Sequence, residues 1–230
     1  FSSAGFLIFI VARFLKYDLA ISKRQFINTV IVGFLFLAYG NGVFVWALKY
    51  VDSGFGALLA STQPLFVLFL MRALYGQKIL PKAIIGVFLG ILGMMLLVQQ
   101  QGLNFGENSF KGILMIFSCV LCWSYASVFV SKNEFPVNQF VSAGYQMITA
   151  GVLLLLASLT LGESWLAPNQ WTVSAQVSML LLILFGSIVA FTSFNYLLKV
   201  VSPEKVATSA YVNPVIALIL GWYVLDEQIS

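Results

Sequence analysis

Two amide–proline pairs stand inside long apolar stretches of the sequence, Gln63-Pro64 and Asn213-Pro214. A proline within a helix leaves a backbone carbonyl without its N–H partner, which for the first pair is the carbonyl of Ala60. An amide side chain is costly in hydrocarbon unless it is hydrogen-bonded. A freed carbonyl beside an amide therefore predicts a site for a small polar ligand. The alternative is a helix kink that a neighbouring helix satisfies.

Further amide and aromatic side chains occur in stretches of the same kind. An aromatic cavity with a few amides would bind the apolar part of an amphipathic metabolite and orient its polar end. The residues that complete this predicted substrate site are Asn41, Trp123, Tyr145, Gln146, Asn195 and Tyr211. For any one of them the alternative is packing between helices or a place in the interfacial aromatic belt. Trp123 and Tyr211 are the strongest aromatic candidates, because each lies well inside a predicted span.

Side chains for enzymatic chemistry are scarce. The sequence has no histidine, no G-x-x-x-x-G-K-[ST] motif, and eight Asp and Glu residues that fall in loops or at the ends of apolar stretches. We therefore predict no catalytic residue, metal site or cofactor, and no ATP-driven step or ATPase subunit. Cys119 and Cys122 form C-x-x-C within an apolar stretch, where they behave as small hydrophobic residues. Proton coupling through a buried carboxylate is disfavoured, so facilitated exchange stays open.

The composition indicates which elements must position these residues. Of the 230 residues, 60% are hydrophobic and only 9% are charged, against about 45–50% and about 25% in soluble domains. This excludes a water-soluble enzyme, and a net charge of +4 is too small and scattered for a nucleic-acid partner. Long apolar blocks with short connections predict an all-α integral membrane protein. The eight predicted spans are roughly 1–15, 26–48, 54–74, 83–99, 112–131, 137–160, 174–198 and 206–225.

Basic residues divide unequally between alternate loops of this span assignment. One side has only Lys49 and Lys111. The other side has Arg13, Lys16, Lys23, Arg24, Arg72, Lys78, Lys82, Lys132, Lys199 and Lys205. Because Lys and Arg in short loops resist translocation, we predict that the larger group faces the cytoplasm.

The chain also aligns with itself. Residues Ala47 to Ile79 match Leu197 to Ile229 without a gap, and the two amide–proline pairs coincide in that alignment. A second match places Phe1 to Phe6 over Phe140 to Tyr145. Five predicted spans separate each helix from its counterpart, so the two copies cross the membrane in opposite orientations. Inverted repeats of this kind let the halves of a secondary transporter exchange conformations around a site near the midplane.

The motifs of the two copies are Ala47-Leu-Lys-Tyr-Val, Ala57 to Pro64, Gly76 to Ile79, Tyr196-Leu-Leu-Lys-Val-Val-Ser, Asn213-Pro-Val and Asp226-Glu-Gln-Ile. Together they resemble the EamA-type repeat of the drug/metabolite transporter superfamily. The resemblance implies a ten-helix fold of two inverted five-helix repeats, here residues 1–100 and 110–230, in a fragment that lacks the first and last helices. It also implies export of amino acids, drugs or other small metabolites. Gln77 departs from the usual Glu of the pattern, which Glu227 keeps in the second copy.

We therefore predict a multi-pass secondary transporter of the bacterial inner membrane that exports small metabolites by alternating access. One alternative is a nucleotide-sugar or sugar-phosphate carrier of the same superfamily, although anionic ligands of that kind favour Lys or Arg in the cavity. Another is an integral-membrane enzyme, which would need clustered acids or histidines. The expected partners are a small-molecule substrate and the lipid bilayer. A glycine stripe at Gly86, Gly90 and Gly93 suits close helix packing and leaves a homodimer open.

Overall fold

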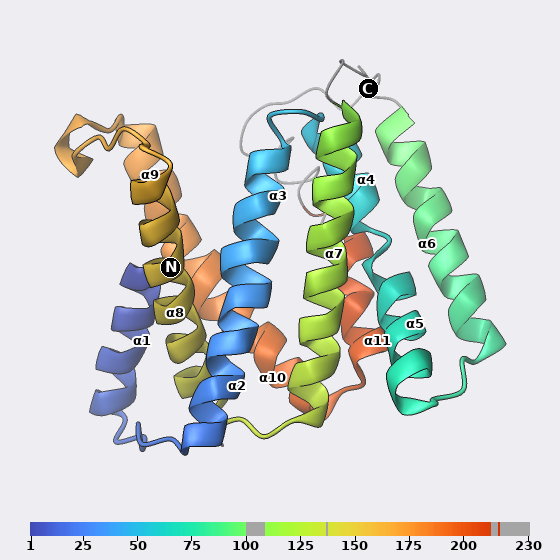
Figure 1. Ribbon diagram of the computed structural model, residues 1–230, viewed down its shortest axis with the longest axis horizontal. Coiled ribbons are helices and arrows are strands. Elements are labelled where there is room, and N and C mark those ends of the chain that lie inside the picture. Colours follow the sequence, from blue (N-terminus) through green and yellow to red (C-terminus); the bar gives the residue numbers. More distant parts are fainter. Residues whose placement is uncertain (100–108, 137, 213–215, 217–230) are drawn as a thin grey trace. The chain divides into compact units, whose positions relative to one another are not determined.

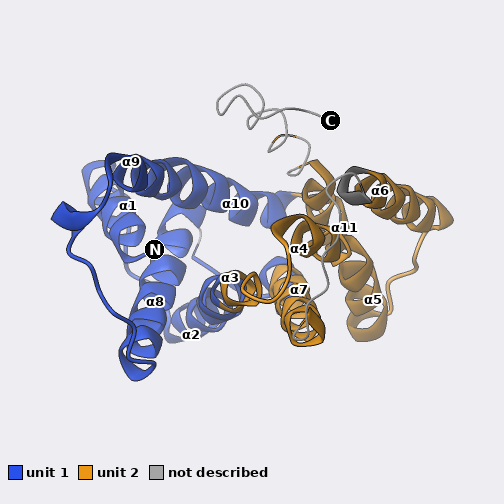
Figure 2. Ribbon diagram, turned by 90° about the horizontal axis from the view of Figure 1, so that it is seen from above, with its two compact units in different colours: residues 1–42, 129–200 blue, residues 43–128, 201–230 orange. Residues whose placement is uncertain are grey.

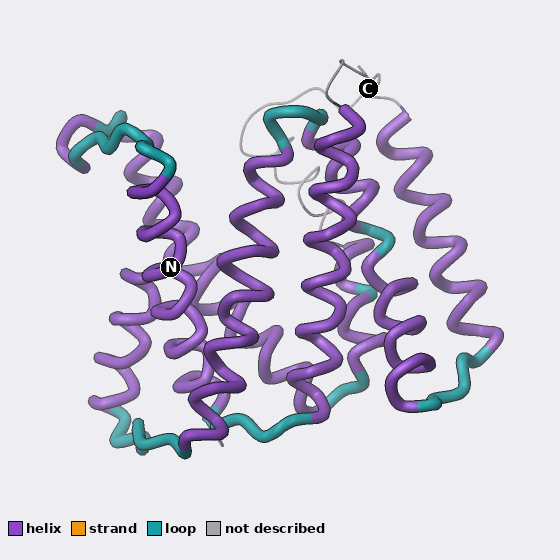
Figure 3. Tube along the Cα trace, in the orientation of Figure 1, coloured by secondary structure: helices purple, strands orange, loops and turns teal. Residues whose placement is uncertain are grey.

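The computed structural model describes residues 1–99, 109–136, 138–212 and 216, and these residues form helices, turns and loops but no strand (Figures 1 and 3). Helices are expected here because a helix satisfies its own backbone N–H and C=O groups where no water is present. The predicted all-α membrane fold is thus confirmed. The predicted span at 206–225 lies mostly outside the described residues, as do Asn213 and Pro214.

Most of the predicted membrane spans correspond to long apolar helices. Within the described part of the chain, the helices long and apolar enough to cross a membrane are Lys23–Ala47, Ser53–Tyr75, Ser109–Lys132, Gln139–Thr160 and Val173–Val200. They match the second, third, fifth, sixth and seventh predicted spans. The helices at the first and fourth predicted spans, Ser2–Phe14 and Pro81–Leu96, are apolar but shorter, and a crossing needs about 20 residues.

The chain forms two compact units, which Figure 2 colours separately. Unit 1 contains Phe1–Gly42 and Phe129–Val200, and unit 2 contains Val43–Val128 and Val201–Ser230. Each unit therefore combines two segments that are distant in the sequence.

Unit 1 is organised around one long helix, α8 (Gln139–Thr160), against which four elements pack. These are α1 (Ser2–Phe14), α2 (Lys23–Gly33), the π-helix η1 (Phe34–Asn41) and α10 (Thr192–Val200). The remaining elements of unit 1 are the short η2 (Pro168–Gln170), α9 (Val173–Leu181) and the π-helix η3 (Leu182–Phe191), which leads into α10.

Local sequence signals start the helices of unit 1. Ser22 and Gln25 form a reciprocal capping box at α2, in which each side chain accepts a hydrogen bond from the other residue's backbone N–H. The side chain of Asn138 caps α8 by accepting from the N–H groups of Phe140 and Val141. Both caps set the first turn of a helix in unit 1 at a residue that the sequence specifies.

The two π-helices contact each other through aromatic rings. The buried ring of Phe36 in η1 lies edge-on to the rings of Phe191 and Phe194, at centroid distances of 5.8 and 5.6 Å. Edge-to-face pairs of this kind contribute about 0.5–1.5 kcal/mol beyond the area they bury. A π-helical turn is wider than an α-helical turn and frequently marks a functional site.

Helices α1 and α8 approach closely at glycines. A Cβ atom on Gly5 would lie 2.8 Å from a side-chain carbon of Ile148, and one on Gly144 would lie 2.9 Å from the ring of Phe9. Contacts run in opposite chain directions, since Ser2 touches Gly151 while Phe9 packs on Tyr145 at 4.8 Å. The two helices are therefore antiparallel, and their separation depends on residues without a side chain.

Unit 2 contains α3 (Gly42–Ala47), α4 (Ser53–Ala60), α5 (Gln63–Tyr75), α6 (Pro81–Gln99), α7 (Ser109–Lys132) and α11 (Pro203–Ala207). The first residue of α3 and the last four of α7 belong to unit 1. One apolar cluster is formed by Ala47, Val51, Leu59, Ile116 and Val120. A second joins Val67, Met71, Val128 and Ala207, so it connects α5, α7 and α11.

The two basic residues predicted to lie outside the cell occupy the same end of unit 2. Lys111 Nζ donates a hydrogen bond to the Tyr50 hydroxyl at 3.3 Å, and Lys49 Nζ lies 4.2 Å from the ring of Trp46. The hydrogen bond from Lys111 lowers the pKa of Tyr50 below its ordinary value, because it stabilises the phenolate. Lys49 and Lys111 share one end of the unit, as the loop alternation requires.

The close contact of Gly33 predicts a stability difference between two glycine variants. A Cβ on Gly33 would lie 2.7 Å from the backbone oxygen of Gln146, whereas nothing lies within 4 Å of one on Gly86. We expect Gly33→Ala to destabilise the protein by about 1–3 kcal/mol, because the clash is with backbone. Gly86→Ala should leave stability unchanged or raise it slightly. Thermal unfolding of the full-length protein in detergent checks this, and equal melting temperatures for the two variants would contradict the packing.

The loop alternation predicts opposite labelling of two positions. In a cysteine-free background, Lys23→Cys should react with a membrane-impermeant maleimide only after the inner face is exposed, whereas Lys111→Cys should react on intact cells. Labelling of both positions from the same side would overturn the topology.

Candidate functional site

Two predicted site residues meet inside unit 1. Gln146 of α8 and Asn195 of α10 are both 0% exposed, and Gln146 Nε2 donates to Asn195 Oδ1 at 3.0 Å. The same Nε2 donates to Ser142 Oγ at 3.2 Å, and Asn195 Nδ2 donates to the carbonyl of Phe191 at 3.0 Å. We call Ser142, Gln146 and Asn195 the amide cluster. Its last hydrogen bond satisfies a carbonyl at the end of the π-helix η3.

One acceptor of the amide cluster is left over. Gln146 Oε1 is buried and has no hydrogen-bond partner among the described residues. A buried polar atom without a partner costs about 1–3 kcal/mol. Gly33 packs on the backbone of Gln146 and so holds this residue of α8 in place. The cluster therefore presents a fixed acceptor oxygen that a ligand N–H or O–H group would satisfy.

The predicted site at Gln63 and Pro64 falls at an interruption of a membrane span in unit 2. Helix α4 ends at Ala60 and α5 begins at Gln63. The hydroxyls of Ser61 and Thr62 donate to the carbonyls of Leu58 and Leu59, each at 2.6 Å. Pro64 thus stands in the first turn of a new helix, where its missing N–H costs nothing, rather than midway along a continuous one. The same two carbonyls also accept from the backbone N–H groups of Ser61 and Thr62, so the hydroxyls find acceptors within the span itself.

Gln63 supplies a donor at this interruption. Its Nε2 atom is buried without a partner among the described residues, while its backbone carbonyl accepts from Ser124 Oγ at 3.4 Å. The N-terminus of α5 carries the partial positive charge of the helix dipole. The interruption is therefore suited to an acceptor group such as a carbonyl or carboxylate oxygen.

Two predicted tyrosines serve in packing. Tyr145 donates to the carbonyl of Leu19 at 3.1 Å and lies against the rings of Phe9 and Phe26. In unit 2, the ring of Tyr211 occupies the space that a Cβ on Gly90 would need, and its hydroxyl donates to the carbonyl of Val87 at 3.3 Å. Gly90, a member of the predicted glycine stripe, thus packs against Tyr211.

Asn41 and Trp123 belong to other elements than the amide cluster. Asn41 is partly buried and precedes Gly42, which packs on Leu154. Leu154 is two turns of α8 beyond Gln146, about 12 Å along the helix. Trp123 is partly buried in α7 of unit 2, where its carbonyl accepts from Ser127 Oγ at 2.9 Å. Asn213 and Pro214 lie outside the described residues.

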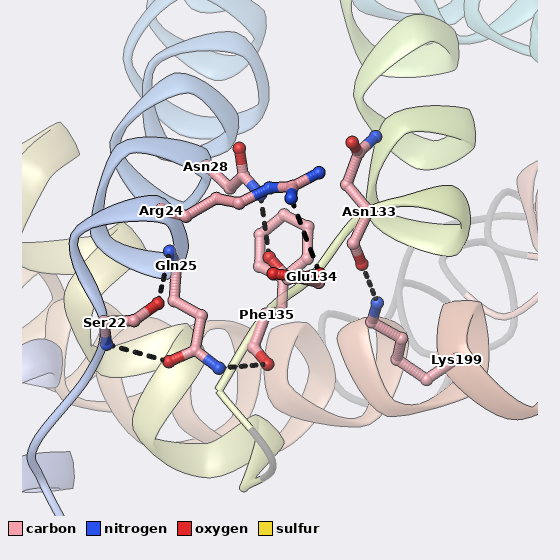
Figure 4. A network of polar contacts seen from close by, with 8 residues as sticks. All are labelled: Ser22, Arg24, Gln25, Asn28, Asn133, Glu134, Phe135 and Lys199. Carbon is pink, nitrogen blue, oxygen red and sulfur yellow. Dashed lines mark hydrogen bonds and ion pairs between the residues drawn. The ribbon is translucent and has the colours of Figure 1, made fainter.

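A polar network that was not predicted from the sequence lies at one end of unit 1 (Figure 4). Three successive carbonyls of the loop after α7 each accept from a side chain of another element. Lys199 Nζ donates to the carbonyl of Asn133 at 2.7 Å. Asn28 Nδ2 donates to the carbonyl of Glu134 at 2.8 Å, and Gln25 Nε2 donates to the carbonyl of Phe135 at 3.2 Å. An exposed ion pair of 3.6 Å between Arg24 and Glu134 lies beside them. We call these three hydrogen bonds the carbonyl clamp.

The carbonyl clamp could not be found from the sequence because its acceptors are backbone atoms. Carbonyl groups carry no residue signature, and the donors come from positions more than 60 residues away. One sequence feature could have pointed to the clamp. Asn28 is a polar residue on the buried face of the amphipathic α2, where it needs a hydrogen-bond partner. The clamp joins α2 and α10 to the loop, at the end that the charge bias assigns to the cytoplasm.

Comparison with known proteins establishes the family. The EamA-like transporter family matches residues 1–99 and 110–230. The chain belongs to this family. The predicted resemblance is therefore confirmed, and so is the prediction of a multi-pass protein of the cell membrane.

Two relatives and one solved structure agree with this assignment. The chain is 36% identical over 208 residues to the "uncharacterized inner membrane transporter YedA" of Escherichia coli (strain K12), covering 90% of the chain and 66% of that protein. It is 25% identical to the "uncharacterized transporter YoaV" of Bacillus subtilis (strain 168), covering 97% and 76%. A crystal structure with 21% identity superposes with a TM-score of 0.80 over the whole chain and 76% of its own length. The chain thus spans about two thirds of the E. coli relative, and the last comparison supports the fold alone.

The hydrogen bond between Gln146 and Asn195 predicts thermodynamic coupling. Gln146→Leu and Asn195→Leu should each destabilise the protein, and the double variant should lose less than the sum, with a coupling of about 0.6 kcal/mol and at most about 1.7 kcal/mol. Reversible unfolding in denaturing detergent measures the cycle. The exposed pair of Ser158 and Glu163, 2.6 Å apart, is the matched control and should show coupling near zero. Additive effects at Gln146 and Asn195 would contradict the predicted contact.

Proposed function

We propose that the chain forms the main part of a secondary transporter that exports small amphipathic metabolites by alternating access. The observation that carries the proposal is the amide cluster, a set of fully buried, uncharged polar groups with a spare acceptor inside an apolar membrane unit. Polar groups at membrane depth are expensive and commonly mark a substrate pathway. Family membership and the names of the relatives support the same conclusion.

We also propose that residues 1–100 and 110–230 are inverted repeats. The contact between α1 and α8 supports this. The sequence match that pairs Gly5 with Gly144 places Phe9 over Ile148 when it is continued without a gap. Gly5 packs on Ile148, and Phe9 packs on Gly144. Exchanging the two copies turns the first contact into the second. A local twofold axis between antiparallel helices requires this relation.

The positions of the irregular helices support the repeat further. In the gapless alignment of Ala47 with Leu197, the π-helix η1 ends opposite the last residue of η3, and α4 begins opposite the first residue of α11. Unit 1 contains residues 1–42 of the first copy and 129–200 of the second, and unit 2 contains the later segments 43–100 and 201–230 together with 110–128 from the start of the second copy. Apart from α7, each compact unit therefore combines corresponding parts of the two repeats, an arrangement suited to exchanging conformations.

The uncharged polar groups of each unit, taken separately, favour a neutral or zwitterionic substrate. Gln146 Oε1 requires a donor and Gln63 Nε2 requires an acceptor. Neither the amide cluster nor the interruption at Ser61 and Thr62 has a charged side chain among its described hydrogen-bonding groups. A multiply charged nucleotide sugar would find no counter-charge there. Amino acids and drug-like amides contain donors as well as acceptors, so they suit the unpartnered atom of either unit.

Growth protection tests this function. Cells that overproduce the full-length protein should tolerate toxic amino acids or drugs better than cells without it, and Asn195→Ala, Trp123→Ala and Asn213→Ala should each reduce protection at least fivefold at equal membrane abundance. Gln176→Ala, at an exposed position near the start of α9, is the control and should protect like the wild type. Unchanged protection in all three site variants would remove the site assignment, and the absence of protection against any compound in the panel would count against export.

A further inference from the structure

A pocket of about 670 Å³ opens at one end of unit 1, between the start of α8 and the second half of the helix Val173–Val200. Its polar lining consists of Asn138, Gln139, Thr192, Ser193, Tyr196 and Lys199. None of the proposed substrate residues lines it, and no carboxylate is among the lining residues. The pocket is therefore a separate site with a positive charge and no negative one.

Two atoms of the lining lack partners. Gln139 Oε1 and Thr192 Oγ1 are buried and make no hydrogen bond to the described residues, although Gln139 Nε2 donates to the carbonyl of Pro136. The amide oxygen requires a donor, and the hydroxyl can donate or accept. An occupant that satisfies both atoms must contain an O–H or N–H group for the amide oxygen, and an acceptor oxygen on it would use the hydroxyl as a donor.

Lys199 gives the pocket its preference for an anion. Its Nζ uses one proton in the carbonyl clamp, toward Asn133, and lies 4.8 Å from the ring of Phe135 (Figure 4). Two further protons remain for a ligand. The ammonium group is thus held in place at the pocket by protein contacts, and the start of α8 adds the positive end of a 22-residue helix.

The rim of the pocket is apolar and continues along a membrane span. Tyr196 and Val200 are 56% and 57% exposed. Along the same helix, the exposed side chains of Phe185 and Val189 extend the apolar surface away from the pocket. Only 6% of the most apolar stretch of Val173–Val200 is buried, against 39–44% in the other long spans. An occupant with hydrocarbon chains would find a surface for them directly beside the polar pocket.

We propose that this pocket binds the headgroup of an anionic phospholipid with free hydroxyl groups, of the phosphatidylglycerol type. The phosphate pairs with Lys199, a headgroup hydroxyl donates to Gln139 Oε1, and Thr192 bonds a phosphate or ester oxygen. The acyl chains lie along the apolar surface of the helix Val173–Val200. Lys199 belongs to the set predicted to face the cytoplasm, so the lipid comes from the inner leaflet, where basic residues at helix ends bind anionic headgroups.

Native mass spectrometry of the delipidated full-length protein tests the proposal. The wild type should bind phosphatidylglycerol at least tenfold more tightly than phosphatidylcholine, and Lys199→Met should remove that preference. Lys199→Arg, which keeps the charge, should retain affinity within threefold. Lys23→Met removes an exposed lysine from the same unit and should change affinity by less than twofold. Equal losses in Lys199→Met and Lys23→Met would indicate general charge attraction and overturn the site.

Two further measurements separate the headgroup contacts from other sources of phosphate. Gln139→Leu should remove the preference for phosphatidylglycerol over phosphatidic acid, because phosphatidic acid has no headgroup hydroxyl. Soluble glycerol 3-phosphate should fail to displace the lipid at a hundredfold excess. Displacement by the soluble ester would identify a solute site instead of a lipid site and overturn the proposal, as would an unchanged lipid preference in Gln139→Leu. Each variant is compared only if it elutes as a single species in size-exclusion chromatography.

Discussion

Inside a bilayer, a polar group that the protein does not satisfy has no water to bond to, and this constraint bears on every polar group within the membrane spans. At the interruption between α4 and α5, the hydroxyls of Ser61 and Thr62 bond to carbonyls one turn earlier. At the end of η3, Asn195 bonds to the carbonyl of Phe191. Side chains thus form hydrogen bonds with the backbone at two places where these membrane spans are irregular.

The few buried polar atoms without partners stand out against that background. Gln146 Oε1 and Gln63 Nε2 remain unsatisfied where their neighbours are bonded. The first atom accepts and the second donates, and neither is charged. Such groups would bind a small polar molecule without the desolvation cost of a buried ion. They are the physical basis for proposing transport of neutral or zwitterionic metabolites rather than multiply charged ones.

Glycine contacts connect this chemistry to the architecture. Gly33 brings η1 and α2 close to the backbone of Gln146, and Gly5 and Gly144 bring α1 onto α8. The reciprocal contacts of Gly5 and Gly144 support an inverted pair of repeats. The pocket at Lys199 lies in the same unit but differs in character, since it combines a cation with an exposed apolar helix. A transported solute and an annular lipid would thus be recognised by different groups of one unit.

Much of the fold followed from the sequence because apolar length and charge bias are local properties. Blocks of about 20 apolar residues specify membrane helices, and the motifs around Ala47 and Tyr196 specify the family. Gln146 and Asn195 were identified individually as polar residues at membrane depth. Their hydrogen bond was not, because residues 49 positions apart meet only through helix packing. The carbonyl clamp, the start of a new helix at Gln63 and the packing role of Tyr211 likewise depend on which backbone atoms come together. Residue types determined that the chain enters the membrane as helices, whereas tertiary contacts decided which polar atoms find partners and which stay available for a ligand.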